Sequence, residues 1–260
     1  MTDVLKLWPL LTATHNYDKS YSTRGRGLGT SIEAPILAYL IETRQGRVLF
    51  DVGCDYHKLS DPQARQQWYD PQEFPMGPPQ MDEEQRLGAH LARMGLNTQD
   101  IDLVFLSHLH FDHAGGLCDV CGAEVHVHED ELQAAREPAD NAYFADDFAG
   151  NVRWRLQQEE YELLPGLQAL NTPGHTAGHM SLMIQLPQGA PIILAGDAAD
   201  LQENIDDEIA PGLCWRDRED MAVASIRKLK ALAADTDAHL WPNHDMAFWR
   251  GLKRFPEYYQ

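Results

Sequence analysis

Residues 107–116 read SHLHFDHAGG and gather three imidazoles and a carboxylate within a few positions, at His108, His110, Asp112 and His113. Imidazole nitrogens and carboxylate oxygens are the ligands that zinc and similar divalent ions prefer. In an extended segment His108 and His110 project to the same side, because side chains alternate with a period of two. So many polar groups after an apolar run have little structural purpose unless a cation compensates them. The stretch therefore predicts a metal site.

Three later segments each place one potential ligand after an apolar run that is typical of a strand. His175 lies in a loop shaped by Pro173 and Gly174, Asp197 follows the run IILAG, and His244 follows HLWPN. With the first cluster they make seven candidate ligands. That number is too large for one tetrahedral zinc ion but fits two metals that share a bridging carboxylate. His179 is expected to support the loop one helical turn after His175.

The elements that must position these ligands are predicted from apolar periodicity. Residues 35–41 are almost continuously apolar, as in a strand buried on both faces, and Gly115 and Gly116 allow a tight start to a helix. Strands are expected at 4–7, 34–42, 47–52, 101–106, 123–128, 167–170, 181–186, 191–195 and 239–241, and helices at 82–94, 129–136 and 217–234. The strands form two groups, each followed by helices, without a long linker. This order predicts an α/β (α+β) fold in which two packed sheets are flanked by helices, in a single domain over residues 1–260.

Two segments lack a clear period. Residues 55–80 contain five prolines and several aromatic residues, which favours a loop or lid without regular elements. Residues 137–160 mix aromatic and acidic residues and are also expected to be irregular. Both segments are candidates for the surface of a homodimer. His126 and His128 alternate with valines and are expected to have a structural or surface role.

The overall charge excludes some partners. Lys and Arg number 21 against 40 Asp and Glu, a formal net charge of −19, which disfavours nucleic acid and anionic membranes. The first residues carry no basic segment followed by an apolar one, and a cytoplasmic protein is expected. Four cysteines are too few for a disulfide framework, and the CxxC pair Cys118 and Cys121 is expected to be ordinary, partly buried thiols.

Together, HxHxDH with His175, Asp197 and His244 resembles the metallo-β-lactamase superfamily of metal hydrolases. The flanking sequence is similar to that of the N-acyl homoserine lactonases, the quorum-quenching branch. It comprises LIET at 40–43, SHLHFDHAGG at 107–116, TPGH and GH within 172–179, and SIRKLK at 225–230. The similarity runs from about residue 34 to 245. It implies an αββα sandwich with the site at one edge of the two sheets.

The resemblance also implies roles for individual residues. One metal would be held by His108, His110 and His175 and the other by Asp112, His113 and His244, with Asp197 as the bridge. The metals would be two divalent ions, with zinc expected and iron, cobalt or manganese also accepted by such ligands. Many members carry a tyrosine three residues after the bridging aspartate, where this chain has Asp200. An ionised carboxylate cannot donate to an oxyanion, so a metal acts alone there, another donor replaces the tyrosine, or the substrate differs.

The expected reaction is the opening of a lactone ring by a hydroxide held between the metals, with a small-molecule lactone as the partner. Asp112 would pass a proton to the departing alkoxide. Phe111 would line an apolar pocket for an acyl chain or pack in the core, and Leu201 and Ile205 are further pocket candidates. The alternatives are a hydrolase of another lactone, ester, thioester or phosphotriester, or a metal-binding or redox module of the same fold.

Overall fold

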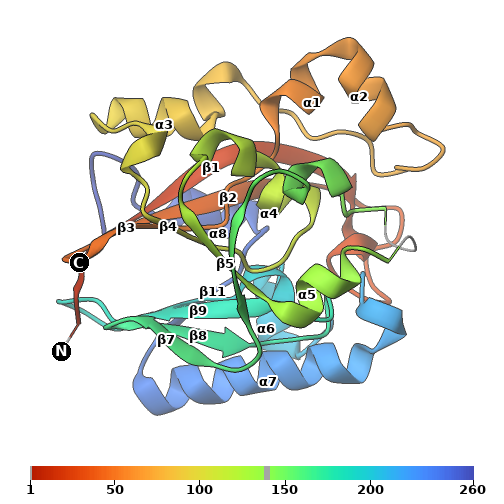
Figure 1. Ribbon diagram of the computed structural model, residues 1–260. Helices are drawn as coiled ribbons and strands as arrows, with labels where there is room; N and C mark the ends of the chain where they lie inside the picture. Colours follow the sequence, from red (N-terminus) through yellow and green to blue (C-terminus); the bar gives the residue numbers. More distant parts are fainter. Residues whose placement is uncertain (1, 138–140) are drawn as a thin grey trace.

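The structure is a computed structural model that describes residues 2–137 and 141–260. Two mixed β-sheets pack face to face, with α3 above one sheet and α7 below the other (Figure 1). The first sheet has the order β1 (Val4–Asp18), β2 (Ser31–Thr43), β3 (Gly46–Phe50), β4 (Leu103–Phe105), β5 (Glu124–His128) and β6 (Arg153–Gln157). The second has the order β11 (His239–Trp241), β10 (Ile192–Leu194), β9 (Met180–Ile184), β8 (Leu167–Asn171) and β7 (Tyr161–Leu164). The predicted αββα sandwich is confirmed.

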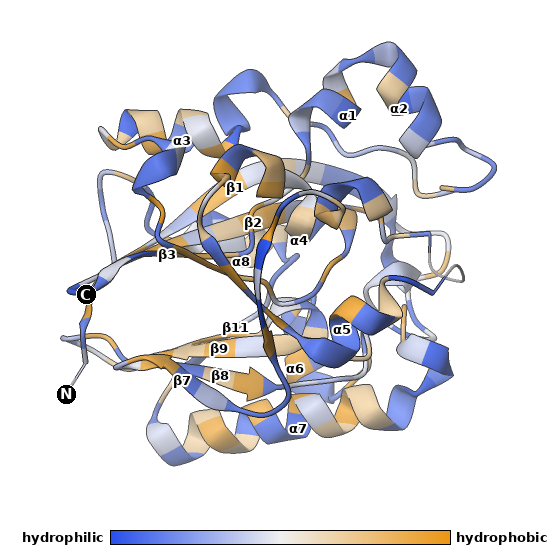
Figure 2. Ribbon diagram, in the orientation of Figure 1, coloured by the Kyte–Doolittle hydropathy of each residue, from blue (hydrophilic) through white to orange (hydrophobic). Residues whose placement is uncertain are grey.

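The helices lie outside the sheets or at the edge where the loops gather. They are α1 (Tyr56–Ser60), α2 (Pro62–Trp68), α3 (Leu87–Arg93), α4 (Phe111–Ala114), α5 (Glu129–Ala134), α6 (Gln202–Asp207), α7 (Glu219–Thr236) and α8 (Met246–Gly251). On α7 the buried residues Ala222, Ile226 and Leu229 recur every three or four positions and cover the second sheet. Figure 2 shows hydrophobic and hydrophilic residues alternating along this helix, as expected of an amphipathic one.

Strand alternation explains why the core has three layers. On β3, Val48 and Phe50 face the space between the sheets, whereas Leu49 faces the outer layer with α3. On β10, Ile192 and Leu194 face inward and Ile193 faces the cluster with α7. Strands with apolar side chains on both faces have near-continuous hydrophobic sequences, as predicted for 35–41.

Three predictions for elements are wrong. β1 continues to Asp18 because it pairs with β2 along its whole length, through register shifts at two points. Residues 55–80 include α1 and α2, because the side chains of Asp55 and Asp61 cap their first turns and Pro62 fits at the start of α2. Residues 137–160 include β6, a strand at the edge of the sheet whose side chains are mostly exposed or half-buried, so it carries no hydrophobic period. The part of that segment at 138–140 lies outside the described residues.

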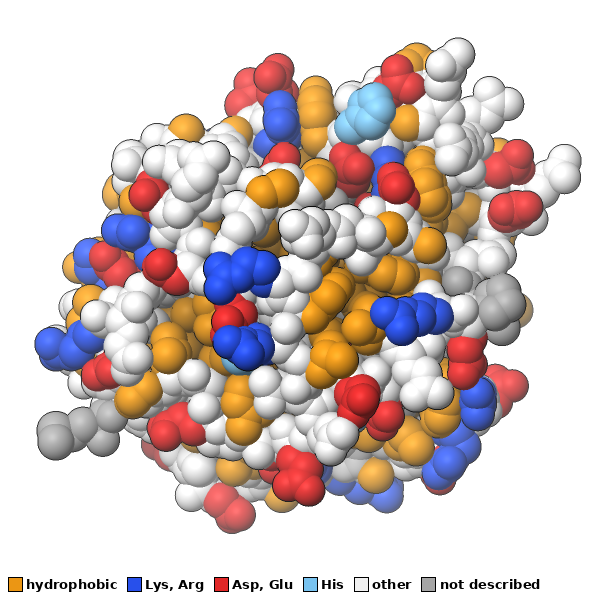
Figure 3. Space-filling view, in the orientation of Figure 1, with side chains coloured by type: hydrophobic (Ala, Val, Ile, Leu, Met, Phe, Trp, Pro, Cys, Tyr) orange, Lys and Arg blue, Asp and Glu red, His pale blue; other side chains and the backbone are white. Residues whose placement is uncertain are grey.

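Four aromatic residues of the two segments considered for a dimer surface face inward. Tyr69, Phe74, Phe144 and Phe148 are each less than a tenth exposed, and the first three pack with Phe111 in one cluster. On the face shown in Figure 3, basic side chains are scattered among acidic ones, and hydrophobic side chains gather near the middle of the view. Among the residues described, no helix is long and apolar enough to cross a membrane.

Candidate metal centre

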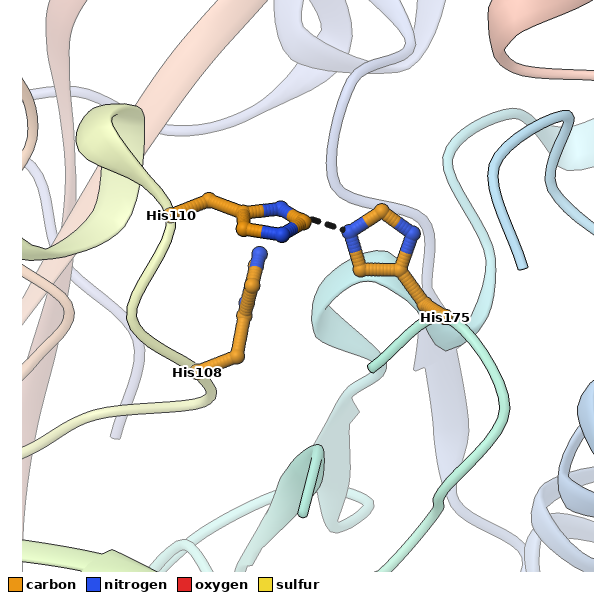
Figure 4. A group of neighbouring side chains, drawn as sticks. All are labelled: His108, His110 and His175. Atoms are coloured by element: carbon orange, nitrogen blue, oxygen red, sulfur yellow. Dashed lines mark hydrogen bonds between the residues drawn. The ribbon is translucent and has the colours of Figure 1, made fainter. Parts of the chain in front are cut away.

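Loops that follow β4, β8, β10 and β11 bring the predicted ligands together. Four groups of side chains each offer ligand atoms within 4.8 Å of one another, and all of these groups are largely buried. The groups are His108–His110–His175, His108–His113–Asp197, Asp112–His113–His244 and Asp197–Asp200–His244. The first and third match the two sets that the resemblance implied. Figure 4 shows the three imidazoles of the first group turned toward one another, with His175 Nε2 3.0 Å from His110 Nδ1.

Asp197 lies between the two sets. Its Oδ1 is 3.3 Å from His113 Nε2 and 3.2 Å from His244 Nε2, and its Oδ2 is 3.4 Å from His175 Nε2. The amide of Asn243 donates to Oδ1 at 3.0 Å. A carboxylate with one oxygen toward each set has the geometry that a bridge between two cations requires.

The imidazoles fit a metal because their remote nitrogens are held by other groups. His244 Nδ1 lies 2.8 Å from the carbonyl of Pro35, and His175 Nδ1 lies 3.1 Å from that of Leu213. Such partners fix the ring orientation and leave Nε2 as the ligand atom. His108 Nε2 and His113 Nε2 are buried and have no hydrogen-bond partner among the described residues, a costly state that a cation would relieve. These residues are able to hold metal ions.

The electrostatics of the cluster also point to cations. Burial alone would lower the pKa of His244, but the carboxylates of Asp197, Asp200 and Asp112 raise it to about 10. Burial lowers the pKa of His108 well below its usual value. Burial and then the charge of Asp197 raise the pKa of Asp200 to about 8. Protons therefore compensate the carboxylates in the absence of metal, and metal ions would take their place.

Asp51 is a supporting residue that the sequence did not reveal. It is fully buried at the end of β3, where it accepts hydrogen bonds from Ser107 N at 2.7 Å, Ser107 Oγ at 2.9 Å and His113 Nδ1 at 2.8 Å. It thereby orients the imidazole of His113 and the backbone that directly precedes His108. The available signal was its position after the apolar run VLF, the same strand–carboxylate order seen at Asp197.

Glu131 on α5 is a second such residue, and it is fully buried. Its Oε1 accepts from Leu109 N at 3.0 Å and from the Tyr143 hydroxyl at 2.9 Å, and its Oε2 accepts from Gly178 N at 3.1 Å. One carboxylate thus ties the loop that carries His108 and His110 to the loop that carries His175. Nothing in the acidic sequence EDEL distinguishes it from its exposed neighbours.

His179 supports the site as predicted, although the loop from His175 is not helical. Its Nε2 accepts from Asp197 N at 2.9 Å, so Nδ1 carries the proton and lies 2.9 Å from Thr172 Oγ1. The glycine pair acts differently from the prediction, since α4 begins before it. A Cβ on Gly116 would lie 2.2 Å from the carbonyl oxygen of Val52, so Gly116 permits close backbone packing.

A small pocket of about 60 Å³ reaches the ligands and adjoins an outer cavity of about 490 Å³. Asp112, Asp200 and Phe111 line the small pocket. Phe111 also packs in the aromatic cluster, so both of its expected roles hold in part. Leu201 and Ile205 are not among the described residues that line these two cavities. Ile205 is buried in the hydrophobic cluster between the second sheet and α7, and Leu201 directly precedes α6.

Two of the remaining histidines and the CxxC pair lie apart from this centre. His126 Nδ1 is 2.8 Å from the hydroxyl of Tyr161, and His128 Nε2 is 3.0 Å from the carbonyl of Gln158, which agrees with structural roles. Cys118 and Cys121 are exposed free thiols rather than partly buried ones. The 3-10 helix at Gly115–Val120 buries Leu117 and Val120 and leaves Cys118 on its outer side, and Cys121 directly follows it.

Comparison with known proteins identifies the family. Residues 32–240 match the model of the metallo-β-lactamase superfamily. The chain is 33% identical to an N-acyl homoserine lactonase of a Bacillus species over 232 residues, which cover 88% of this chain and 89% of that protein. It superposes with a TM-score of 0.87 on a mutant of Bacillus thuringiensis AiiA that has N-decanoyl-L-homoserine bound at the active site (28% identity, 99% and 100% coverage). A second structure, an N-acyl homoserine lactone hydrolase with N-hexanoyl-L-homoserine bound at the catalytic metal centre, gives 0.85 (29% identity, 99% and 100% coverage). The chain belongs to the metallo-β-lactamase superfamily and, within it, to the family of the N-acyl homoserine lactonases.

Proposed function

We propose that this protein is a dinuclear-metal hydrolase that opens the lactone ring of N-acyl homoserine lactones. The observation that carries the proposal is the pair of ligand sets meeting at Asp197 on the floor of a pocket that adjoins a larger cavity. The relatives named above supply the substrate class, since they are lactonases of N-acyl homoserine lactones and bind acyl-homoserines.

The ligand sets would hold two divalent ions, for which zinc is proposed because all seven donors are imidazoles or carboxylates. When bound, such ions supply a Lewis-acidic centre and lower the pKa of water, so that a nucleophile is present at neutral pH. Elemental analysis of the purified protein tests the identity of the metal.

Asp112 is proposed as the residue that moves the proton. Its Oδ2 is 3.6 Å from His113 Nε2 and 3.8 Å from His244 Nε2, and its side chain is 14% exposed, so it faces both the ligands and the small pocket. A carboxylate that holds a metal through one oxygen keeps a second oxygen for proton transfer. Asp112 would deliver the proton to the alkoxide of the opened ring.

The outer cavity would accept the acyl chain. Its wall includes apolar side chains near the small pocket, among them Phe74, Met76, Ala142 and Leu213, with Trp215 farther along the loop after α6. Apolar walls with a few polar groups at one end are typical of sites that bind small amphipathic molecules. Phe111, packed against Phe74, would close the inner end.

A panel of substrates tests the proposal. The protein, loaded with Zn²⁺, is given N-hexanoyl homoserine lactone, γ-butyrolactone, δ-valerolactone and a glutathione thioester, and acid release is followed by pH-stat. We expect rapid opening of the acyl homoserine lactone and at least a 10²-fold loss in D112N, the scale of a lost general acid–base residue. As a matched control, D130N on the exposed start of α5 should retain wild-type activity. Cleavage of the thioester without opening of any lactone would replace this proposal by the thioester alternative.

We further propose a single cytoplasmic domain over residues 1–260 that acts as a homodimer. Limited proteolysis, cell fractionation and sedimentation velocity test these three points separately.

A further inference from the structure

The small pocket presents several acceptors to a substrate and few donors. Asp112, Asp197 and Asp200 contribute carboxylates to it, and two phenols, those of Tyr17 and Tyr21, also line it. A carbonyl oxygen that gains negative charge during lactone opening needs a hydrogen-bond donor nearby. Ionised carboxylates cannot supply one. Two pocket side chains that can supply such a donor are the phenols of Tyr17 and Tyr21.

Tyr17 is the phenol that the fold holds in place. It is the penultimate residue of β1, paired with Ile32 of β2, and it is only 9% exposed. Its ring packs edge-on against His15 and Tyr21, with centroids 5.1 Å and 6.3 Å apart. A tyrosine anchored by a strand and two rings loses little further freedom when a substrate binds.

A buried hydroxyl holds the Tyr17 phenol in place. Its Oη lies 2.8 Å from Oγ of Ser22, which is fully buried. Asn204 Nδ2 donates to the backbone carbonyl of Ser22 at 2.9 Å and holds this residue in position. The phenol proton is free for a substrate oxygen when the Ser22 hydroxyl donates to Tyr17 Oη rather than to the neighbouring carboxylate of Asp200.

The charges around the phenol suit a donor. Burial, followed by the negative charges of Asp200, Asp197 and Asp112, raises the pKa of Tyr17 well above its usual value, so the phenol keeps its proton. Asp200 is suited to the opposite role. Its Oδ1 is buried and has no hydrogen-bond partner within residues 2–137 and 141–260. It belongs to a ligand group with Asp197 and His244, so a cation bound there would keep it an acceptor.

We propose that Tyr17 is a further catalytic residue, whose phenol donates a hydrogen bond to the lactone carbonyl oxygen as negative charge develops on it. The inference rests on the proposed lactonase function and assigns a residue to one step of it. With Tyr17 as the donor, Asp200 does not have to donate a hydrogen bond. A carboxyl group at position 200 is then compatible with attack on a lactone carbonyl.

The test compares Y17F with the wild type, both loaded with Zn²⁺, on N-hexanoyl homoserine lactone. Loss of one donor to an oxyanion is expected to lower kcat about 10²- to 10³-fold. KM should stay within about threefold, because the bond strengthens mainly in the transition state. The matched control is Y161F. It removes the hydroxyl of Tyr161 on β7, which is hydrogen-bonded to His126 on β5, and should leave kcat unchanged. Metal content and Tm, measured for each variant, report whether the fold and the centre are intact.

A second readout separates catalysis from structure. A lactam analogue of the substrate, labelled with ¹³C at the ring carbonyl, is bound to each protein, and its carbonyl stretch is recorded by infrared difference spectroscopy. In Y17F the band should move to higher frequency than in the wild type, since one hydrogen bond to the oxygen is lost, whereas Y161F should match the wild type. This measurement does not depend on turnover.

The outcomes distinguish the two proposals. If the wild type opens no lactone, the proposed function fails. If the wild type is active and Y17F keeps kcat within threefold, or its carbonyl band coincides with that of the wild type, the role of Tyr17 is refuted. A large loss of kcat in Y21F but not in Y17F would likewise refute it and assign the donor to Tyr21.

Discussion

The buried carboxylate of Glu131 allows a quantitative test of how the two ligand loops are joined. In E131A the backbone N–H groups of Leu109 and Gly178 lose the acceptors that lie 3.0 Å and 3.1 Å away. Each buried donor left without a partner costs about 1–3 kcal/mol, so the free energy of unfolding should fall by roughly 2–6 kcal/mol. For a chain of this size that corresponds to a fall in Tm of roughly 5–20 °C.

The same substitution should loosen the metal centre, because Leu109 lies between two of the predicted ligands and Gly178 follows a third. Removing an outer partner of metal ligands typically lowers metal affinity by about 10–100-fold. In E131Q the amide oxygen can still accept from Leu109 N while its NH₂ faces Gly178 N, so about half of the loss in stability is expected.

The assay is urea unfolding of the metal-free protein together with competition for Zn²⁺ against a chromophoric chelator. E129A is the matched control, since Glu129 lies on the same helix but is exposed and contacts the side chain of Gln158. If E131A were as stable as E129A and bound Zn²⁺ as tightly as the wild type, the role assigned to Glu131 would be refuted.

Three further predictions concern protonation and buried charge. Burial lowers the pKa of His179 to about 3, whereas the unfolded side chain titrates near its ordinary 6.5. Between these two pKa values the unfolded chain binds a proton at His179 that the folded protein does not bind. The free energy of unfolding therefore keeps its full value above about pH 6.5 and falls as the pH drops toward 3. Urea unfolding of the metal-free protein between pH 8 and 4 should show this loss and a weaker one in H179Q; equal slopes would contradict it. K58M should cost about 3–5 kcal/mol, because it leaves the buried carboxylate of Asp147 without its cation, and the double variant K58M/D147L should recover much of that loss. Urea unfolding of both variants is the check, and a single variant as stable as the wild type would argue against an ion pair. Loading Zn²⁺ at pH 7 should release protons, since carboxylates raise the pKa of His244 to about 10 and a protonated imidazole cannot bind metal. Calorimetry in two buffers of different ionisation enthalpy measures this release, and identical heats would contradict it.

Strands that are buried on both faces could be predicted from the sequence, whereas a strand with few apolar side chains could not. β2 and β10 were predictable because each carries a near-continuous apolar run between turns. β6 is an edge strand with mostly exposed or half-buried side chains, so its place in the sheet depends on pairing with β5 rather than on its own pattern. The end of β1 was missed for a related reason, since its length follows from the register with β2.

The candidate site divides in a similar way. The seven predicted ligands were visible because each has a distinctive residue type after a strand, and the structure brings them together. Asp51, Glu131 and Tyr17 were not visible, because an acid or a tyrosine in sequence carries no record of its burial. Their roles depend on contacts between segments far apart in the chain, such as Asp51 with His113 and Glu131 with Gly178.

Two metal ions, held by the ligand sets that meet at Asp197, are proposed to support the opening of a lactone. The most direct measurement is acid release from N-hexanoyl homoserine lactone by the metal-free protein as Zn²⁺ is added in steps. We expect activity to rise to a plateau at two ions per chain. Full activity at one ion per chain would contradict the dinuclear site, and a fully loaded protein that leaves the lactone closed would contradict the function.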